Sequence, residues 1–144
     1  MAVLLCDAPF QPAAETARFE SSLASGSYGA TASFIGTMRD FNEGVDVSGM
    51  TLEHYPGMTE KQLAEIIDDA HKQWDILDAL IVHRTGDIAP GQPIVLTVVC
   101  SAHRAAAFDA CRFLMEALKS RVTFWKKETL VNGEQRWVEK NTPG

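Results

Sequence analysis

Long apolar segments are missing from this 144-residue sequence. The longest run of mostly apolar residues, Ile94–Cys100, has the length of one strand, whereas a helix that crosses a bilayer needs about 18–20 such residues. The first seven residues carry neither the basic leader nor the apolar stretch of a secretory signal. We therefore expect a cytoplasmic protein that is not embedded in a membrane.

Cysteine is also scarce, with three residues and no Cys-x-x-Cys pair among them. The odd number and the spacing argue against a disulfide framework and a thiolate zinc site, and we interpret Cys6, Cys100 and Cys111 as buried thiols. No spacing of His, Asp and Glu matches a metal site, and the G-x-S-x-G and glycine-rich phosphate-binding motifs are absent. We expect neither a metal nor a cofactor.

The composition is that of a globular chain, with 46% hydrophobic and 22% charged residues, and the length predicts one domain over residues 1–144. Basic residues are fewer than acidic ones, and the net charge is −6. The segment 103–127 nevertheless carries six basic and two acidic residues, a net charge of +4. A cationic segment on an acidic chain indicates a focused anion site rather than a nucleic-acid surface. A solvated helix face followed by a basic hairpin edge is the alternative.

Hydrophobic periodicity predicts three helices. The first covers residues 13–23, the second begins at a capping box formed by Thr59 and Gln62, and the third follows Ser101 as its N-cap. The apolar stripes of the second and third helices are Leu63, Ile66, Ile67, Ala70 and Trp74, and Cys111, Leu114, Met115 and Leu118.

Strands are predicted between and after these helices, and Asn132-Gly133 indicates a C-terminal β-hairpin. The polar, glycine-containing segment Asp40–Gly49 is expected to be a mobile loop. This order of elements favours an α+β fold on a mostly antiparallel sheet, with a doubly wound α/β fold as the weaker alternative. The predicted strands are residues 28–38, 50–55, 77–84, 94–100, 123–130 and 135–139.

His103 and Arg104 fall in the first turn of the third predicted helix. Unpaired N–H groups and the helix dipole already favour an anion there, and cations oppose the dipole unless an anion is bound. The two residues therefore indicate a phosphate or carboxylate site, with simple surface exposure as the alternative. The remaining histidines receive other interpretations: structural roles in strands for His54 and His83, and a solvated position for His71.

Three further basic positions complete the candidate anion site. Lys119 ends the third helix, and Arg39 ends the strand that precedes the predicted loop. Because side chains alternate along a strand, Lys126 shares a face with Phe124 while Lys127 points the opposite way, so only one of the two lysines can join the site.

Four motifs follow one another along the chain: Leu52-Glu-His-Tyr-Pro-Gly-Met58, Ser101-Ala-His-Arg104, Lys119-Ser-Arg121 and Phe124-Trp-Lys-Lys-Glu128. In this order they resemble the large, catalytic subunit family of molybdopterin synthase. The resemblance covers residues 29–138, and four separate motifs at fitting spacing make it specific. Thr123 stands where the family commonly has proline, Thr85 replaces an expected aliphatic residue, and little sequence follows the last motif. Gly36-Thr-Met-Arg39 also fits the glycine-to-arginine segment of the family.

The resemblance implies an α/β-hammerhead-type fold and a sulfurtransferase activity. Such enzymes convert cyclic pyranopterin monophosphate, also called precursor Z, into molybdopterin by inserting two sulfurs. The sulfur donor is the C-terminal Gly-Gly thiocarboxylate of a small ubiquitin-like subunit, so no protein cysteine is required. The implied assembly is a central homodimer with one small subunit at each far end, a heterotetramer.

The resemblance also implies roles for residues. Lys119 and Lys126 are the expected catalytic groups near the thiocarboxylate, with Lys119 acting as an acid/base or carbonyl-polarising group. Arg39, His103 and Arg104 are expected to bind the pterin phosphate, with part of the pocket supplied by the other copy in the dimer. The substrate-binding set also includes Lys127.

Two other functions fit the sequence. The chain could be a non-enzymatic module that docks a ubiquitin-like tail by β-augmentation. It could also be a generic phosphate-ester enzyme, but such an enzyme needs a metal or a nucleophile that the sequence does not reveal.

Overall fold

A four-stranded sheet forms the centre of the computed structural model, which describes residues 2–138. Its strands are ordered β1-β5-β7-β2, and only the β1–β5 pair is parallel among the strand pairs described. The central strands are almost entirely buried, because both faces of the sheet are covered. The bounds are β1 Ala2–Cys6, β2 Ala30–Thr37, β5 Asp78–Arg84 and β7 Pro93–Ser101.

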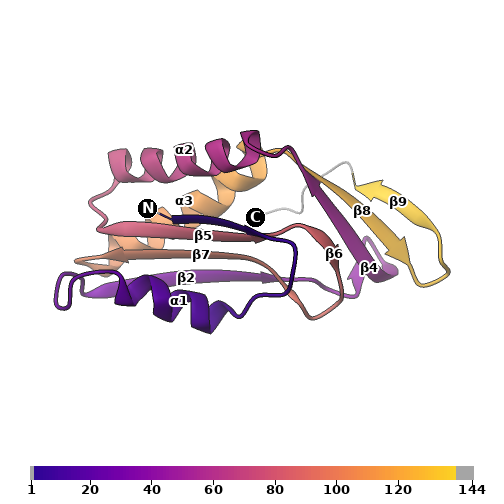
Figure 1. Ribbon diagram of the computed structural model, residues 1–144, viewed down its shortest axis with the longest axis horizontal. Coiled ribbons are helices and arrows are strands. Elements are labelled where there is room, and N and C mark those ends of the chain that lie inside the picture. Colours follow the sequence, from indigo (N-terminus) through magenta and orange to yellow (C-terminus); the bar gives the residue numbers. More distant parts are fainter. Residues whose placement is uncertain (1, 139–144) are drawn as a thin grey trace.

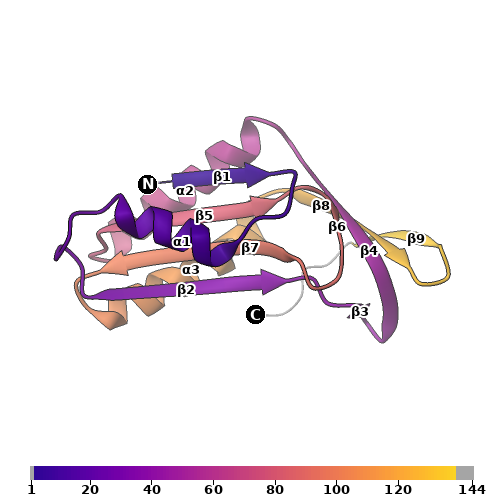
Figure 2. The ribbon, with the colours of Figure 1, turned by 60° about the horizontal axis from the view of Figure 1, so that its bottom comes forward.

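Helices pack on both faces of this sheet. α2 (Met58–Gln73) and α3 (Arg104–Arg121) cover one face, and α1 (Pro12–Ser21) crosses the other (Figures 1 and 2). Successive side chains of β5 point to opposite faces of the sheet, so the core has two parts. Ile81 packs with residues of α2 and α3, and Val82 packs with Phe10 and Phe19 on the α1 side. The long sheet thereby fixes the axis of α3.

A second sheet, of five strands, stands at one end of the first (Figure 1). β4 (Val45–His54) is its longest strand and pairs with β3 (Phe41–Asn42), β6 (Gly86–Ile88) and β8 (Phe124–Leu130), and β8 pairs with β9 (Gln135–Val138). All these pairs are antiparallel. A separate apolar cluster lies beneath the sheet, formed by Met38, Val47, Met50, Leu52 and Ile88.

The predicted α+β class with mostly antiparallel strands is confirmed, although the strands form two sheets. Three helices lie where periodicity predicts them, and Leu63, Ile66 and Leu114 of the predicted stripes are fully buried. The hairpin at Asn132-Gly133 is also confirmed, with Gly133 at a φ of 89°. Glu139, the last residue of the last predicted strand, lies outside the described residues.

The prediction of a mobile loop at Asp40–Gly49 is wrong. Most of this segment is a hairpin, in which Phe41–Asn42 pairs with Val45–Asp46 across a turn formed by Glu43 and Gly44 with φ angles of 52° and 76°. The segment has little apolar content because Val47 is its one buried residue, Asn42 and Gly49 are half-buried, and its other residues are exposed.

The N-caps predicted for the second and third helices, Thr59 and Ser101, are wrong. α2 begins at Met58 after Gly57, whose N–H is bound by the Glu60 carboxylate, while the Thr59 hydroxyl donates to the Tyr55 carbonyl at 3.0 Å. α3 has His103 rather than Ser101 as its N-cap residue, because β7 continues through Ser101. Hydrophobic periodicity carries no information about the residues just before each helix, so it did not predict the true N-cap positions.

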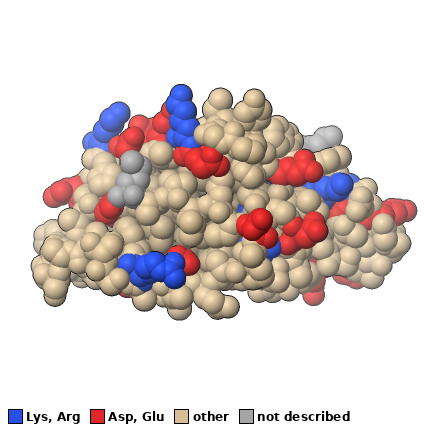
Figure 3. Space-filling model, viewed as in Figure 1, with Lys and Arg blue, Asp and Glu red and all other residues tan. Residues whose placement is uncertain are grey.

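Charged groups on the surface are mixed in sign. On the face drawn in Figure 3, Lys and Arg side chains are interspersed with acidic ones and form no continuous basic stripe. Cys100 and Cys111 are buried as predicted, while Cys6 is half-buried. Within residues 2–138, no helix combines the length and the hydropathy that a membrane-spanning segment needs.

Candidate active site

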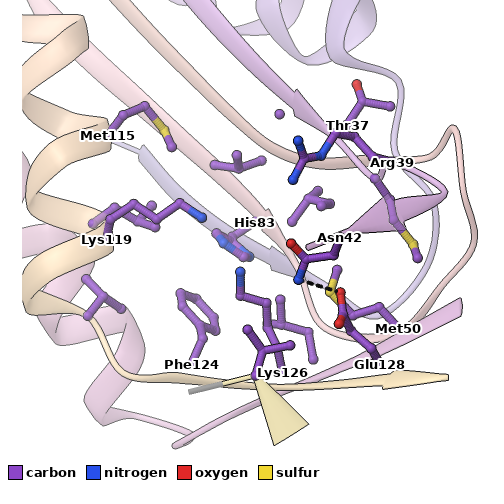
Figure 4. A pocket seen from close by; sticks show the side chains of 18 of the residues that line it. Thr37, Arg39, Asn42, Met50, His83, Met115, Lys119, Phe124, Lys126 and Glu128 are labelled. Carbon is purple, nitrogen blue, oxygen red and sulfur yellow. Dashed lines mark hydrogen bonds between the residues drawn. The ribbon is translucent and has the colours of Figure 1, made fainter. Parts of the chain in front are cut away.

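A cavity of about 570 Å³ lies where the two sheets meet the C-terminal half of α3 (Figure 4). Its size is typical of small-molecule sites. The apolar part of its wall includes Met50, Leu52 and Met115, and the polar part is described below. Segments from residue 34 to residue 138 contribute to this wall, so the fold assembles the cavity from distant parts of the chain.

Lys119 and Lys126 bring two amino groups together inside this cavity. Lys119 projects from the last turns of α3 and Lys126 from β8, and the two amino groups lie close enough for each to shift the pKa of the other. Burial, followed by the charge of Lys126, lowers the pKa of Lys119 to about 8. Burial also lowers the pKa of Lys126, and the charge of Arg39 acts in the same direction. Two confined ammonium groups repel each other, so an anion bound between them is favoured.

Arg39 borders the same cavity from the segment after β2. Its side chain is exposed, and its Cζ atom lies 4.9 Å from the centroid of the Phe41 ring. A guanidinium over an aromatic face gains cation–π stabilisation. The hairpin predicted as a loop thus supplies a platform that holds Arg39 beside the cavity.

A carboxylate that the sequence analysis missed also borders the cavity. Glu128 lies two residues after Lys126 on β8 and is buried. Its two oxygens accept hydrogen bonds of 3.0 Å from Asn42 and from Arg136, as Figure 4 shows for Asn42. The charge of Glu128 raises the pKa of Lys126 and so opposes the effect of burial, but Glu128 is also paired with Arg136, which leaves the cavity with a net positive charge. The alternation of β8 could have suggested Glu128, but not its partner Asn42.

His83 is the second polar wall residue that the site prediction omits. It lies at the end of β5, is 4% exposed, and stacks on the Phe124 ring with centroids 4.0 Å apart. Its Nδ1 lies 2.8 Å from the Arg84 carbonyl oxygen. Burial, opposed by this hydrogen bond and assisted by the charges of Lys119 and Lys126, lowers the pKa of His83 to about 4. The predicted structural role of His83 fits the stack, but its place beside both lysines has no signal in the sequence.

His103 and Arg104 do not border this cavity. They stand at the start of α3, and Lys119 lies about 24 Å further along the helix axis at 1.5 Å per residue. Both side chains are exposed. Within one chain, the structure therefore brings together Arg39, Lys119 and Lys126 but leaves His103 and Arg104 at the far end of α3.

Lys127 is the remaining predicted site residue, and it points away from the cavity. Its Nζ atom lies 5.4 Å from the centroid of the Trp137 ring on the opposite face of the β8–β9 hairpin. The assignment of Lys127 to the substrate-binding set conflicts with this position, because strand alternation admits only Lys126. Among the described residues, no group of three or more His, Cys, Asp or Glu side chains could hold a metal ion.

Comparison with known proteins identifies the family. The family model described as MoaE protein matches residues 5–121. This chain belongs to the MoaE family. It is 48% identical over 139 residues to the molybdopterin synthase catalytic subunit of Pseudomonas aeruginosa, a match that covers 96% of this chain and 91% of that protein. The corresponding subunit from Ralstonia nicotianae is 58% identical over 111 residues, covering 77% of this chain and 62% of the relative.

Solved structures of the MoaE family share the fold. The MoaE protein from Burkholderia ambifaria matches with a TM-score of 0.82 and 38% identity, covering 100% of this chain and 93% of that one. Molybdopterin synthase from Staphylococcus aureus matches with a TM-score of 0.84 and 30% identity, covering 94% and 95%. The resemblance drawn from the sequence motifs is confirmed at the level of the family, whose named relatives are catalytic subunits of an enzyme.

Proposed function

We propose that this chain is the catalytic subunit of a molybdopterin synthase. In this proposal it inserts two sulfurs into cyclic pyranopterin monophosphate, each taken from the C-terminal thiocarboxylate of a separate copy of a small ubiquitin-like subunit, which is left as a carboxylate. The observation that carries the proposal is the placement of Lys119, Lys126 and Arg39 around one cavity, with the two amino groups close enough to shift each other's pKa. The names of the relatives support it.

The charge of this cavity suits the reaction. The substrate carries a cyclic phosphate, the donor is a thiocarboxylate, and the tail ends as a carboxylate after its sulfur has moved to the substrate. Preorganised cations stabilise negative charge where it develops, most strongly where water is excluded. The ammonium of Lys119 polarises the acyl group, and Lys126 holds the anion against it. Sulfur comes from the partner, so the buried Cys100 and Cys111 need no role in the chemistry.

His103 and Arg104 enter the proposal through a second copy of the chain. Both are exposed at a helix start, where unpaired N–H groups favour an anion and cations alone oppose the dipole. We place them at the substrate phosphate in the cavity of a partner copy, within a homodimer that carries one small subunit at each far end. The three free cysteines suit a reducing compartment, so a cytoplasmic location is part of the proposal.

Reconstitution from purified components tests the function. We expect the chain, mixed with thiocarboxylated small subunit and cyclic pyranopterin monophosphate, to form molybdopterin. The same small subunit with an ordinary carboxylate terminus is the control and must give no product. Tight binding of the small subunit without product would instead favour the docking module, the alternative that the sequence left open.

A further inference from the structure

The second polar wall residue, His83, has features that a purely structural histidine does not need. His83 is a buried residue of β5 whose side chain borders the cavity. Its ring stacks on Phe124 with an interplanar angle of 14°, and its Nδ1 lies 2.8 Å from the Arg84 carbonyl oxygen. These two contacts fix the orientation of the ring. Figure 4 shows the ring between the ends of the Lys119 and Lys126 side chains. A rigid imidazole thus lines the same cavity as the two amino groups that the proposed function uses, near enough for their charges to act on it.

The contact with Arg84 determines which nitrogen carries the proton. A carbonyl oxygen can only accept, so Nδ1 must donate to it. In a neutral imidazole, Nε2 is then the acceptor nitrogen. Burial disfavours the imidazolium, and the charges of Lys119, Lys126 and His54 disfavour it further. The ring therefore keeps a lone pair on Nε2 at the pH at which Lys119 is an ammonium.

We propose that His83 is a positioning residue for sulfur transfer, whose Nε2 accepts a hydrogen bond from the Lys119 ammonium and holds it at the reacting acyl group. This inference rests on the proposed function and adds a residue to it. Lys119 has several rotatable bonds and lies beside the like charge of Lys126, so a fixed acceptor nitrogen restricts the directions in which its ammonium can point. A neutral imidazole restrains the Lys119 ammonium and leaves its positive charge available to the substrate. A carboxylate at the same place would neutralise that charge.

Two measurements on the wild-type protein test the arrangement without turnover. Nitrogen NMR of the histidine rings, with the His83 signal assigned by its loss in H83Q, should show the Nδ1-protonated tautomer. Carbon NMR of the lysine side chains should show Lys119 titrating near pH 8, the reference value for the variants below. An Nε2-protonated ring in the wild type would overturn the proposal.

Variants then separate positioning from a merely structural role. In H83F, which keeps a stacked ring but removes the acceptor, kcat should fall on the order of 10²-fold while KM for cyclic pyranopterin monophosphate stays within about twofold. The Lys119 titration midpoint should also fall, because the ammonium loses an acceptor and gains an apolar neighbour. H83Q retains an acceptor oxygen and should recover part of both values. Wild-type kcat together with an unchanged Lys119 titration in H83F and H83Q would contradict the proposal.

The matched control is H71F. His71 is exposed on α2 with its Nε2 3.4 Å from Asp78, away from the cavity, and its substitution should leave kcat and the Lys119 titration unchanged. If H83F does not fold, the His83 tautomer in the wild type and the Lys119 titration in H83Q still test the proposed hydrogen bond. If the wild-type protein forms no molybdopterin, the proposed function fails, whereas the NMR measurements still judge the contact between His83 and Lys119.

Discussion

At the scale of single residues, the cavity takes its charge from three cations of which two are half-buried. Lys119 and Lys126 have lost part of their hydration, and their pKa values are lowered because the uncharged amine is easier to bury. The third cation, the Arg39 guanidinium, is exposed. The charge of the cavity is therefore sensitive to pH near the Lys119 pKa of about 8.

The pH dependence of the reaction should show this sensitivity. Because the ammonium form polarises the acyl group, kcat/KM should fall as the pH rises through about 8, where Lys119 loses its proton. The K119R variant, whose guanidinium keeps its charge, should be slower but should not show this fall. K119A should lose about 10²- to 10⁴-fold in rate while still binding the small subunit. A rate that increases through pH 8 would mean that the free amine is the active form.

The two neighbouring lysines of β8 make a matched pair. K126A removes a cavity cation, and we expect sulfur transfer to fall at least 10²-fold. K127A removes only a contact with the Trp137 ring on the other face, so kcat and KM should change by less than about twofold. Steady-state kinetics of both variants decides the point. Equal losses would contradict the strand orientation that separates the two side chains.

Among single residues, local pattern predicted some roles and missed others. Strand alternation placed Lys126 correctly beside Phe124, because that relation depends on two residues only. Glu128 and His83 were missed because their roles depend on Asn42, 86 residues away, and on Phe124, which a different strand brings over the ring. Contacts of that range follow from how the sheets pack, and no local periodicity contains them.

At the scale of elements, α3 carries predicted site residues at both ends. Its 18 residues begin at Arg104 and end two residues after Lys119. The start of the helix is set by the β7–α3 junction, where the Gly29 N–H donates to the Ser101 carbonyl at 3.0 Å. A Cβ atom on Gly29 would lie 2.6 Å from the Ala102 carbonyl oxygen, so a residue with a side chain must displace this junction.

Gly29 therefore offers a test of that junction. G29A should lower the free energy of unfolding by about 1–3 kcal/mol through overpacking, and it should raise KM for the precursor because His103 and Arg104 move with the junction. G49A is the control, since its Cβ would come no closer than 3.8 Å to the Ile88 carbonyl oxygen, and its effect should be about 0.5 kcal/mol or less. Urea denaturation and kinetics measure both. A G29A variant as stable and as active as wild type would contradict the close packing.

The elements themselves were predicted best where a long apolar stripe exists. α2 and α3 bury such stripes against a sheet, and the C-terminal hairpin has an Asn-Gly turn that allows few alternatives. The short strands β3 and β6 have no stripe to reveal them, because each is defined by its pairing with β4. The platform beneath Arg39 was accordingly interpreted as a loop.

At the scale of the whole molecule, the predicted anion-binding residues form two separate groups. Arg39, Lys119 and Lys126 meet in the cavity, whereas His103 and Arg104 stand about 24 Å away along α3. One chain cannot close that distance, because α3 is held along its length by the first sheet. A two-fold dimer can, since it places the same surface of each copy against its partner.

Activity of mixed dimers tests this arrangement most directly. R104A alone should mainly raise KM, and K119A alone should be inactive, so the assay uses precursor far below the wild-type KM. In dimers reassembled from equal amounts of both variants, about half are mixed, and each of these has one intact site built from the Lys119 of one copy and the Arg104 of the other. We predict recovery of about a quarter of wild-type activity. Activity no greater than the average of the two separate variants would contradict the shared site.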